Sequence, residues 1–151
     1  MKIYLATDHR GFELKEKIKG WLKEWGYEYE DMGAFELNKD DDYPDFAELA
    51  ATRVASQPDS RGILICGSGI GVTVAANKVK SIIAGTMMDP DQTKASVSDE
   101  NTNIIGLSAD YLSEENNKAI VKAFLETEFS GAERHIRRLN KIETIETKNF
   151  K

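Results

Sequence analysis

The sequence has 151 residues, a net charge of -6, 40% hydrophobic residues and 30% charged residues. This composition is typical of a globular protein, and the length predicts one domain over residues 1–151 that buries roughly two thirds of its unfolded surface. The acidic balance argues against a nucleic-acid-binding protein, which needs a basic face, and no apolar run is long enough to span a membrane.

Strand-like and helix-like segments alternate from the N-terminus onward. The apolar part of residues 1–6 is too short for a signal peptide, so we interpret residues 3–7 as a first strand. An amphipathic helix is predicted over residues 12–25, because apolar side chains recur there at steps of three and four residues, and Gly26 is a natural stop. The next elements are a strand over residues 27–32, an acidic loop over residues 38–42, and a helix that Pro44 opens and that reaches residue 56.

The second half of the chain continues the alternation. Residues 62–66 are apolar throughout, as expected for a parallel strand covered on both faces. Asp89 and Pro90 form a good N-cap and first helical position, and Ser113 caps a later helix. The predicted elements are a strand over 62–66, a helix over about 70–80, a strand over 82–88, a helix over 90–98, a strand over 103–107, a helix over 113–127 and, after Gly131, a basic helix to about residue 146.

This alternation predicts the α/β fold class, as a three-layer αβα, Rossmann-like arrangement with a five-stranded, mainly parallel sheet. Ligands of such sheets bind beyond the carboxyl ends of the strands. The polar or glycine-rich segments that we expect at or near that edge are Asp8 and His9, residues 66–71, Asp89 and the loop over residues 99–103.

Cys66, the only cysteine, ends an apolar strand and begins a cluster of glycines that opens a helix. Backbone N–H groups at such a turn suit an anion, and a thiol held there lies in a positive potential that favours the thiolate. The segment therefore combines a base or nucleophile with an oxyanion cradle. The plainer interpretation is a small buried hydrophobic residue at a strand end. A lone cysteine also excludes an intrachain disulfide and fits a reducing cytoplasm.

Ordered motifs over nearly the whole chain resemble one known family. Those motifs are Asp8-His9-x-Gly11, Asp42-Tyr43-Pro44, Ile63-Leu64-Ile65-Cys66-Gly67-x-Gly69-x-Gly71, Ala75-Ala76-Asn77-Lys78, Asn101-x-Asn103, Phe129-x-Gly131 and Arg134-His135-x-Arg137-Arg138. The chain is similar to the type B ribose-5-phosphate isomerases and the related galactose-6-phosphate isomerase subunits, with one apparent extra residue between Gly131 and Arg134. The resemblance implies a cytoplasmic enzyme that uses no metal or organic cofactor. It would act in carbohydrate metabolism, for example in the pentose phosphate pathway.

The resemblance implies aldose–ketose isomerisation of a sugar phosphate through an enediolate. Cys66 would move a proton between neighbouring carbons, and Ser68 would hydrogen-bond the substrate. Backbone N–H groups would stabilise the oxyanion, at about 3–4 kcal/mol for each well-placed donor. These donors would be the N–H groups of Gly67, Gly69, Ile70 and Gly71.

The resemblance also assigns the substrate's phosphate to His9, Arg134 and Arg138, and guanidinium groups suit such an anion. In the family the site lies between two subunits of a homodimer or homotetramer, so the C-terminal helix and the loop around Asp99 would reach a partner subunit. Taken singly, the same residues could be turn residues, caps or solvated charges. The further residues that would line the site are Asp8, Tyr43 and Asn101.

Two positions depart from the family pattern. Asp99 stands where type B ribose-5-phosphate isomerases have a histidine that is credited with opening the furanose ring, and an ionised carboxylate accepts a proton but cannot donate one. Asp110 stands where relatives carry a phosphate-binding arginine, an exchange of cation for anion that would repel a phosphate. Relatives also often have Tyr-Ser-Ala-Arg where this chain has residues 91–94.

Three substrate classes are compatible with these departures. Asp99 or water could open the ring of an ordinary pentose or hexose phosphate. A tetrose 4-phosphate stays open-chain because its potential ring oxygen carries the phosphate. A sugar with less negative charge could have its hydroxyl groups bound by Asp99 and Asp110.

Two interpretations come from other functional classes. A dinucleotide-binding domain would explain the glycines after a strand and Asp89 at the end of the next strand, but Val72 stands where the third glycine belongs and the chain has no room for a substrate domain. A catalytically silent relative that acts as a binding or regulatory subunit would explain Asp99 and Asp110, although Cys66 is retained.

Overall fold

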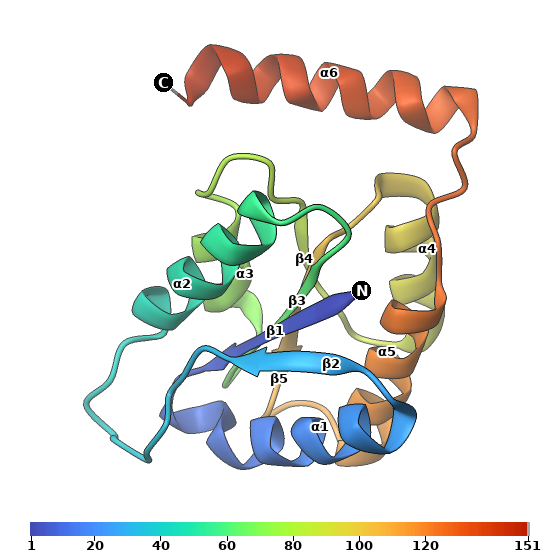
Figure 1. Cartoon of the computed structure of the whole chain (residues 1–151). Coiled ribbons are helices and arrows are strands. Elements are labelled where there is room, and N and C mark those ends of the chain that lie inside the picture. The colour runs from blue at the N-terminus through green and yellow to red at the C-terminus, as the bar shows by residue number, and fades with distance from the viewer. Residues whose placement is uncertain (151) are drawn as a thin grey trace.

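Five parallel strands form one sheet in the computed structural model, which describes residues 1–150 (Figure 1). Their order across the sheet is β2-β1-β3-β5-β4. The register pairs Thr7 with Ile65 and Cys66 with Ser108, so the carboxyl ends of β1, β3 and β5 meet at one edge. This confirms the predicted five-stranded parallel sheet. The strands are β1 (Lys2–Thr7), β2 (Glu28–Asp31), β3 (Arg61–Cys66), β4 (Ala84–Thr86) and β5 (Ile104–Ser108).

Helices cover both faces of the sheet and complete the predicted three layers. Apolar side chains of α2 and α3 pack on one face, and those of α1, α4 and α5 pack on the other. Among residues 1–150, none of the helices combines the length and the apolar character that a membrane crossing needs. The helices are α1 (Phe12–Trp25), preceded by a 3-10 turn over His9–Gly11, α2 (Tyr43–Ser56), α3 (Ile70–Ala76), α4 (Pro90–Glu100), α5 (Glu114–Glu126) and α6 (Glu133–Asn149).

Local signals explain where α1 ends and where α4 and α5 begin. Gly26 adopts a φ of 81°, a left-handed conformation that glycine takes without steric cost, and its N–H bonds the last carbonyls of α1. The Asp89 carboxylate accepts a hydrogen bond from Gln92 N at 2.8 Å, and Ser113 Oγ accepts one from Asn116 N at 3.1 Å. These caps satisfy donors that the first turn of a helix leaves free.

Two elements are shorter than predicted. The helix expected over about 70–80 ends at Ala76, and the strand expected over 82–88 covers only Ala84–Thr86. Asn77 is the physical reason, because its side-chain amide donates to Ala84 O and accepts from Ala84 N, both at 2.9 Å. This pair of hydrogen bonds ties the end of α3 to the start of β4, so the chain turns where the sequence pattern predicts further helix.

The α4 helix carries the chain from the carboxyl edge of the sheet back to the amino edge. Asp89 follows β4, as predicted, whereas residues 99–103 lie just before β5. The prediction that this loop lies at or near the carboxyl edge is therefore wrong. A helix of 11 residues spans about 16 Å and separates Asp99 and Asn101 from the edge that holds Cys66.

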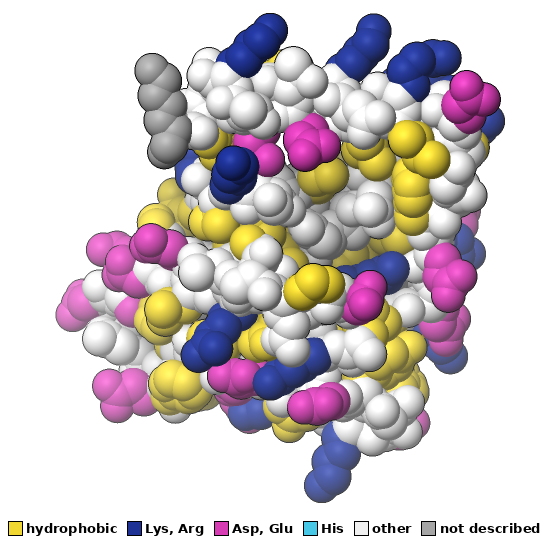
Figure 2. Space-filling view, turned by 45° about the horizontal axis from the view of Figure 1, so that its top comes forward, with side chains coloured by type: hydrophobic (Ala, Val, Ile, Leu, Met, Phe, Trp, Pro, Cys, Tyr) yellow, Lys and Arg dark blue, Asp and Glu magenta, His cyan; other side chains and the backbone are white. Residues whose placement is uncertain are grey.

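The C-terminal helix α6 lies apart from the three layers (Figure 1). His135 Nδ1 donates to Asp99 O at 2.8 Å, and Glu146 Oε1 accepts a hydrogen bond from Ser81 N at 2.7 Å. Figure 2 shows hydrophobic side chains in the hollow beneath α6, while Lys and Arg side chains project from its outer side. Ile136, Ile142 and Ile145 of α6 are 43%, 45% and 61% exposed. The helix therefore leaves apolar surface uncovered in the single chain.

Candidate active site at the carboxyl edge of the sheet

Cys66 ends β3 and is almost completely buried, with 4% of the residue exposed. The backbone N–H of Gly69 donates to its Sγ at 3.2 Å. Tyr4, Ala6 and Val72 belong to the same apolar cluster as Cys66, so the burial expected for a small hydrophobic residue at a strand end is present together with the backbone donor. The sulfur is therefore held by a backbone donor and largely shielded from water in the single chain.

Two glycines of the loop after Cys66 are in contact with side chains from distant segments. A Cβ at Gly67 would lie 2.6 Å from Arg10 Nε, and a Cβ at Gly71 would lie 2.7 Å from Tyr43 Cζ. Only a residue without a side chain allows these approaches. The loop therefore brings Tyr43 to the start of α3 and places the Arg10 guanidinium beside the residue that follows Cys66.

Two of the predicted oxyanion donors are already hydrogen-bonded. Gly69 has a φ of 77°, and a Cβ there would lie 2.9 Å from the carbonyl carbon of Leu107. Its N–H bonds the Cys66 sulfur, and the N–H of Ile70 bonds Ser68 Oγ at 3.2 Å. The Ser68 hydroxyl thus lies at the N-terminal end of α3. The loop donors outside these two bonds are the N–H groups of Gly67, Ser68 and Gly71.

His9 follows β1 and is fixed by an acidic residue from the loop before α2. Asp41 Oδ1 accepts hydrogen bonds from the backbone N of His9 at 2.9 Å and from its ring Nδ1 at 2.7 Å. The Asp41 side chain is 9% exposed, and its Oδ2 has no hydrogen-bond partner among the described residues. Because a carboxylate accepts from Nδ1–H, Nε2 is the ring nitrogen left free for a ligand.

Asp8 is buried and caps the turn that follows β1. Its Oδ1 accepts a hydrogen bond from Arg10 N at 3.0 Å, and burial raises the pKa of the carboxyl above its usual value. Ligand atoms of Asp8, His9 and Asp41 all lie within 4.8 Å of one another, a spacing that a metal ion could use. In the structure these carboxylates already accept hydrogen bonds from their neighbours, so the cluster is held together by its own polar groups.

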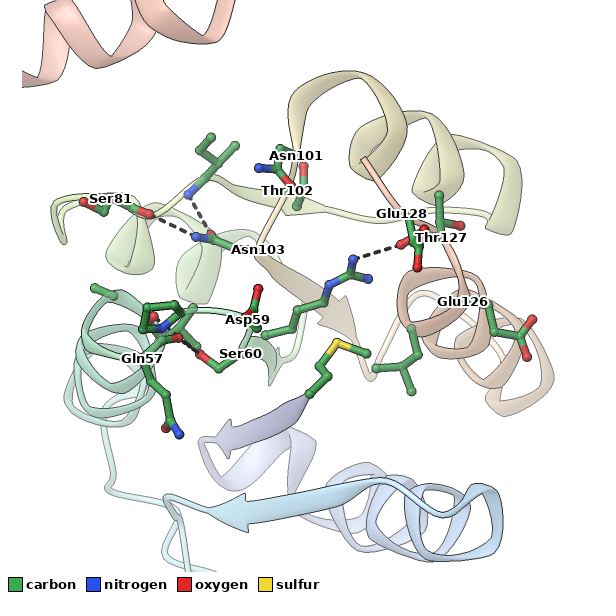
Figure 3. Close-up of a pocket in the computed structure, with 17 residues that line it drawn as sticks. Gln57, Asp59, Ser60, Ser81, Asn101, Thr102, Asn103, Glu126, Thr127 and Glu128 are labelled. Carbon is green, nitrogen blue, oxygen red and sulfur yellow. Dashed lines mark hydrogen bonds between the residues drawn. The ribbon is translucent and has the colours of Figure 1, made fainter. Parts of the chain in front are cut away.

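The remaining predicted residues lie at the amino edge or on α6. The Asp99 carboxylate lies 3.6 Å from His135 Nδ1, and Asn101 has a φ of 52° and caps the end of α4. Asn101 lines a cavity of about 570 Å³ at the amino edge, where Asn103 donates to Ser81 O at 3.0 Å (Figure 3). Arg134 and Arg138 are exposed on α6.

The structure therefore divides the predicted site into two groups. The first group gathers at the carboxyl edge of the sheet and contains Asp8, His9, Tyr43, Cys66, Gly67, Ser68, Gly69, Ile70 and Gly71. The second group lies elsewhere on the chain and contains Asp99, Asn101, Arg134 and Arg138.

Sequence reasoning missed Asp41 and Arg10. Residues 38–42 were interpreted only as an acidic loop, and Arg10 occupies the variable position between His9 and Gly11. The structure also pairs Arg10 with Asp110, which corrects the expected uncompensated anion after β5. No spacing in the sequence brings Arg10 and Asp110 together, because they are 100 positions apart.

Comparison with known proteins gives consistent matches. The family described as Ribose/Galactose Isomerase matches residues 3–142. The protein named "Probable ribose-5-phosphate isomerase B" of Mycoplasma pneumoniae is 41% identical over 140 residues, which cover 93% of this chain and 91% of the relative. Ribose-5-phosphate isomerase B of Mycolicibacterium paratuberculosis is 40% identical, with 93% and 88% covered.

Solved structures agree with these sequence matches. Ribose-5-phosphate isomerase B from Mycoplasma genitalium, determined with bound ribulose-5-phosphate, superposes with a TM-score of 0.94 and 38% identity over 98% of this chain and 97% of that chain. Ribose-5-phosphate isomerase B from Clostridium thermocellum gives a TM-score of 0.93 and 40% identity, with 98% and 99% covered.

Proposed function

Because the chain belongs to the ribose/galactose isomerase family, we propose that this aldose–ketose isomerase acts on a sugar phosphate, with ribose 5-phosphate and ribulose 5-phosphate as the first candidates. One observation carries the proposal. The Cys66 sulfur accepts a hydrogen bond from Gly69 N at the carboxyl edge of a sheet that superposes on an enzyme solved with ribulose-5-phosphate.

In the proposed reaction the Cys66 thiolate removes the proton from C2 of the aldose, and the electron pair forms the C1–C2 double bond of an enediolate. The thiol then returns the proton to C1. The O2 hydroxyl proton moves to O1, so that C2 becomes the carbonyl carbon of the ketose. Ser68 Oγ is the hydroxyl closest in sequence to the thiol and is suited to relay that second proton. Free N–H groups of the loop would stabilise the enediolate oxygen.

The phosphate would be held from two directions. His9 offers Nε2, since Asp41 fixes the other ring nitrogen. Arg134 and Arg138 would come from a second copy, because they project from a helix whose apolar face is uncovered in the single chain. We therefore propose a homodimer or homotetramer with each site shared between subunits. In that assembly Asp99 and Asn101 of the second copy would also approach the substrate.

The ion pair between Asp110 and Arg10 affects which substrate classes are favoured. The proposal of a less negatively charged sugar rested partly on this carboxylate, and its pairing with Arg10 removes that support. Pentose, hexose and tetrose phosphates stay candidates. For cyclic substrates the ring would be opened by Asp99 of the second copy or by water.

A coupled assay with ribose 5-phosphate, allose 6-phosphate, galactose 6-phosphate and erythrose 4-phosphate tests this function. We expect turnover of at least one substrate, and a fall in kcat of about 10²–10⁴-fold in Cys66→Ala, the range typical of a lost general base. Cys66→Ser keeps an atom that can accept the hydrogen bond from Gly69 N but removes the acidic thiol, so a similar loss of activity separates lost proton transfer from a lost hydrogen bond. Unchanged turnover in Cys66→Ala would refute the base. A folded wild-type protein that is inactive on all four substrates would favour the silent-relative interpretation.

A further inference from the structure

The Arg10 side chain contacts the glycine loop that follows Cys66, a contact that the sequence pattern does not predict. A Cβ built on Gly67 would lie 2.6 Å from Arg10 Nε and 2.8 Å from Nη1, so the guanidinium plane rests on the Gly67 Cα. Gly67 directly follows Cys66, and its N–H is one of the loop donors that form no local bond to Cys66 or Ser68. A guanidinium group therefore contacts the residue that directly follows the proposed base.

The position of this guanidinium is set by groups on the far side of the loop. Its Nη2 pairs with Asp110 Oδ2, and the backbone N of Asp110 donates to Gly67 O at 3.0 Å. Ser108 Oγ donates to the same Gly67 carbonyl at 2.8 Å. Arg10, Gly67 and Asp110 thus form one connected unit across the ends of β1, β3 and β5. An isolated exposed ion pair is worth little to stability, so stability alone gives no reason for placing this pair over the glycine loop.

The guanidinium keeps donors that can reach a ligand. The Arg10 side chain is 54% exposed, and its contact with Asp110 uses Nη2, which leaves N–H groups on Nε and Nη1. Asp110 is 37% exposed, so the pair lies at the surface rather than in the core. The other cation beside it, Lys17, is likewise ion-paired, with Glu114 at 2.5 Å, but the three atoms nearest a Cβ built on Gly67 all belong to Arg10. Arg10 is therefore the cation at this edge with both free donors and contact with the glycine loop.

We propose that Arg10 binds the phosphate group of the substrate from the same chain that supplies Cys66. This inference rests on the proposed function and adds a ligand for the phosphate that the sequence did not indicate. His9 and Arg10 both follow β1, and their side chains pair with different segments, His9 with Asp41 before α2 and Arg10 with Asp110 after β5, so they would approach the phosphate from two sides. The ion pair with Asp110 holds the guanidinium against Gly67.

Steady-state kinetics of Arg10→Gln and Arg10→Lys test the proposal, with Lys17→Gln as the matched control from the neighbouring ion pair. We expect Arg10→Gln to raise KM for the sugar phosphate, and the inhibition constant of inorganic phosphate, by the same factor of about 10–100, while kcat changes little. Arg10→Lys keeps the charge but loses the planar fork, so its effect should be intermediate. Lys17→Gln should change neither constant.

A folded Arg10→Gln protein with unchanged KM and unchanged phosphate inhibition overturns the proposal and leaves the proposed function intact. Thermal denaturation with and without inorganic phosphate supplies a readout that does not depend on turnover. A phosphate-induced rise in Tm that disappears in Arg10→Gln supports Arg10 as the ligand, even if no tested sugar phosphate is converted. A rise that is equal in both proteins, or absent from the wild type, counts against it.

Discussion

The two edges of the sheet are built in different ways. At the carboxyl edge, short turns follow the strands and side chains bond one another closely, as in His9 with Asp41 and Cys66 with Gly69. At the amino edge and on α6, the corresponding residues face outward, and Arg134 and Arg138 are exposed. Under the proposed function, the carboxyl edge supplies one half of a site. The other half would be Arg134, Arg138 and the residues of the amino edge from a second copy of the chain.

The largest expected effect is the recovery of activity when two impaired variants are mixed. This experiment tests whether the two edges contribute to one shared site. Cys66→Ala removes the proposed base at one edge, and Arg138→Ala removes a proposed phosphate ligand on α6. Each variant alone should be impaired, by about 10²–10⁴-fold for Cys66→Ala. If chains exchange freely after mixing, half of the dimers carry one intact site, and activity should recover to about a quarter of the wild-type value.

The control for this experiment is Arg137→Ala, which removes a neighbouring exposed charge of α6. It should keep wild-type activity and give no extra recovery when mixed with Cys66→Ala. If the Cys66→Ala and Arg138→Ala mixture stays inactive although affinity tags on one variant co-purify the other, each site is made by one chain. The shared site would then be ruled out.

Asp31→Asn tests how firmly the carboxyl edge is held together. Lys15 is completely buried, and its Nζ donates to Asp31 Oδ1 at 2.6 Å and to Ala34 O at 2.5 Å. Removing the carboxylate leaves a buried cation unpaired, which costs about 3–5 kcal/mol. The half-exposed surface pair of Lys2 with Glu30 is the matched control, and Glu30→Gln should cost far less than Asp31→Asn. Urea denaturation at pH 7 measures both differences.

The same variant predicts a pH dependence. Burial alone would raise the pKa of Asp31, but hydrogen bonds from Lys15, Gly33 N and Lys19 outweigh it and hold the pKa below the usual 3.8. A depressed carboxyl pKa stabilises the fold fully above pH 3.8, and the contribution disappears as the pH falls through the lower folded-state value. The stability difference between wild type and Asp31→Asn should therefore shrink in acid. An equal difference at pH 7 and in strong acid would contradict this assignment.

Gly69→Ala probes the loop itself and should have a moderate effect. Its φ of 77° and the Leu107 carbonyl carbon at 2.9 Å from a built Cβ leave no room for a methyl group. We expect a loss of about 1–3 kcal/mol in unfolding free energy together with a fall in kcat, since the N–H that bonds Cys66 must shift. Gly20→Ala in α1, where a Cβ meets nothing within 4 Å, should instead stabilise the protein by about 0.5–1 kcal/mol. Loss of stability with unchanged kcat would remove Gly69 from the site.

Asp41→Asn tests the contribution of one hydrogen bond at the carboxyl edge and should have the smallest effect. The variant loses the carboxylate that fixes the His9 ring, so KM for the sugar phosphate should rise about fivefold, as expected for one weakened hydrogen bond. Asp40→Asn changes the neighbouring exposed carboxylate and should leave KM unchanged. A fall in Tm without any change in KM would mean that Asp41 only supports the loop before α2.

The fold was predictable because each element has a local cause. Apolar strands that alternate with amphipathic helices specify a parallel sheet, and Gly26, Asp89 and Ser113 mark helix ends within the sequence itself. The exceptions have non-local causes. The end of α3 depends on the Asn77 side chain reaching Ala84, which periodicity does not report.

The candidate site was predictable where its residues form one segment or directly follow a predicted strand, as Asp8 and His9 do. Cys66 and the glycines after it form one continuous segment, so their chemistry is visible in the sequence. Asp41 and Arg10 owe their places to loops that meet in three dimensions, and Asp99 lies at the far edge because α4 reverses the chain. The shielding of the thiol likewise arises from side chains of separate elements that converge on β3.

The packing around the glycine loop affects how the same glycines should be interpreted in homologous sequences. A side chain at Gly67 would collide with Arg10, one at Gly69 with the backbone of β5, and one at Gly71 with Tyr43. Selection for a stable fold would preserve Gly69 even in a descendant that no longer turns over substrate, because its φ of 77° and its backbone neighbours leave no room for a side chain. Retention of Gly69 in a divergent homologue is therefore a marker of architecture, whereas the sulfur beside it is informative about catalysis.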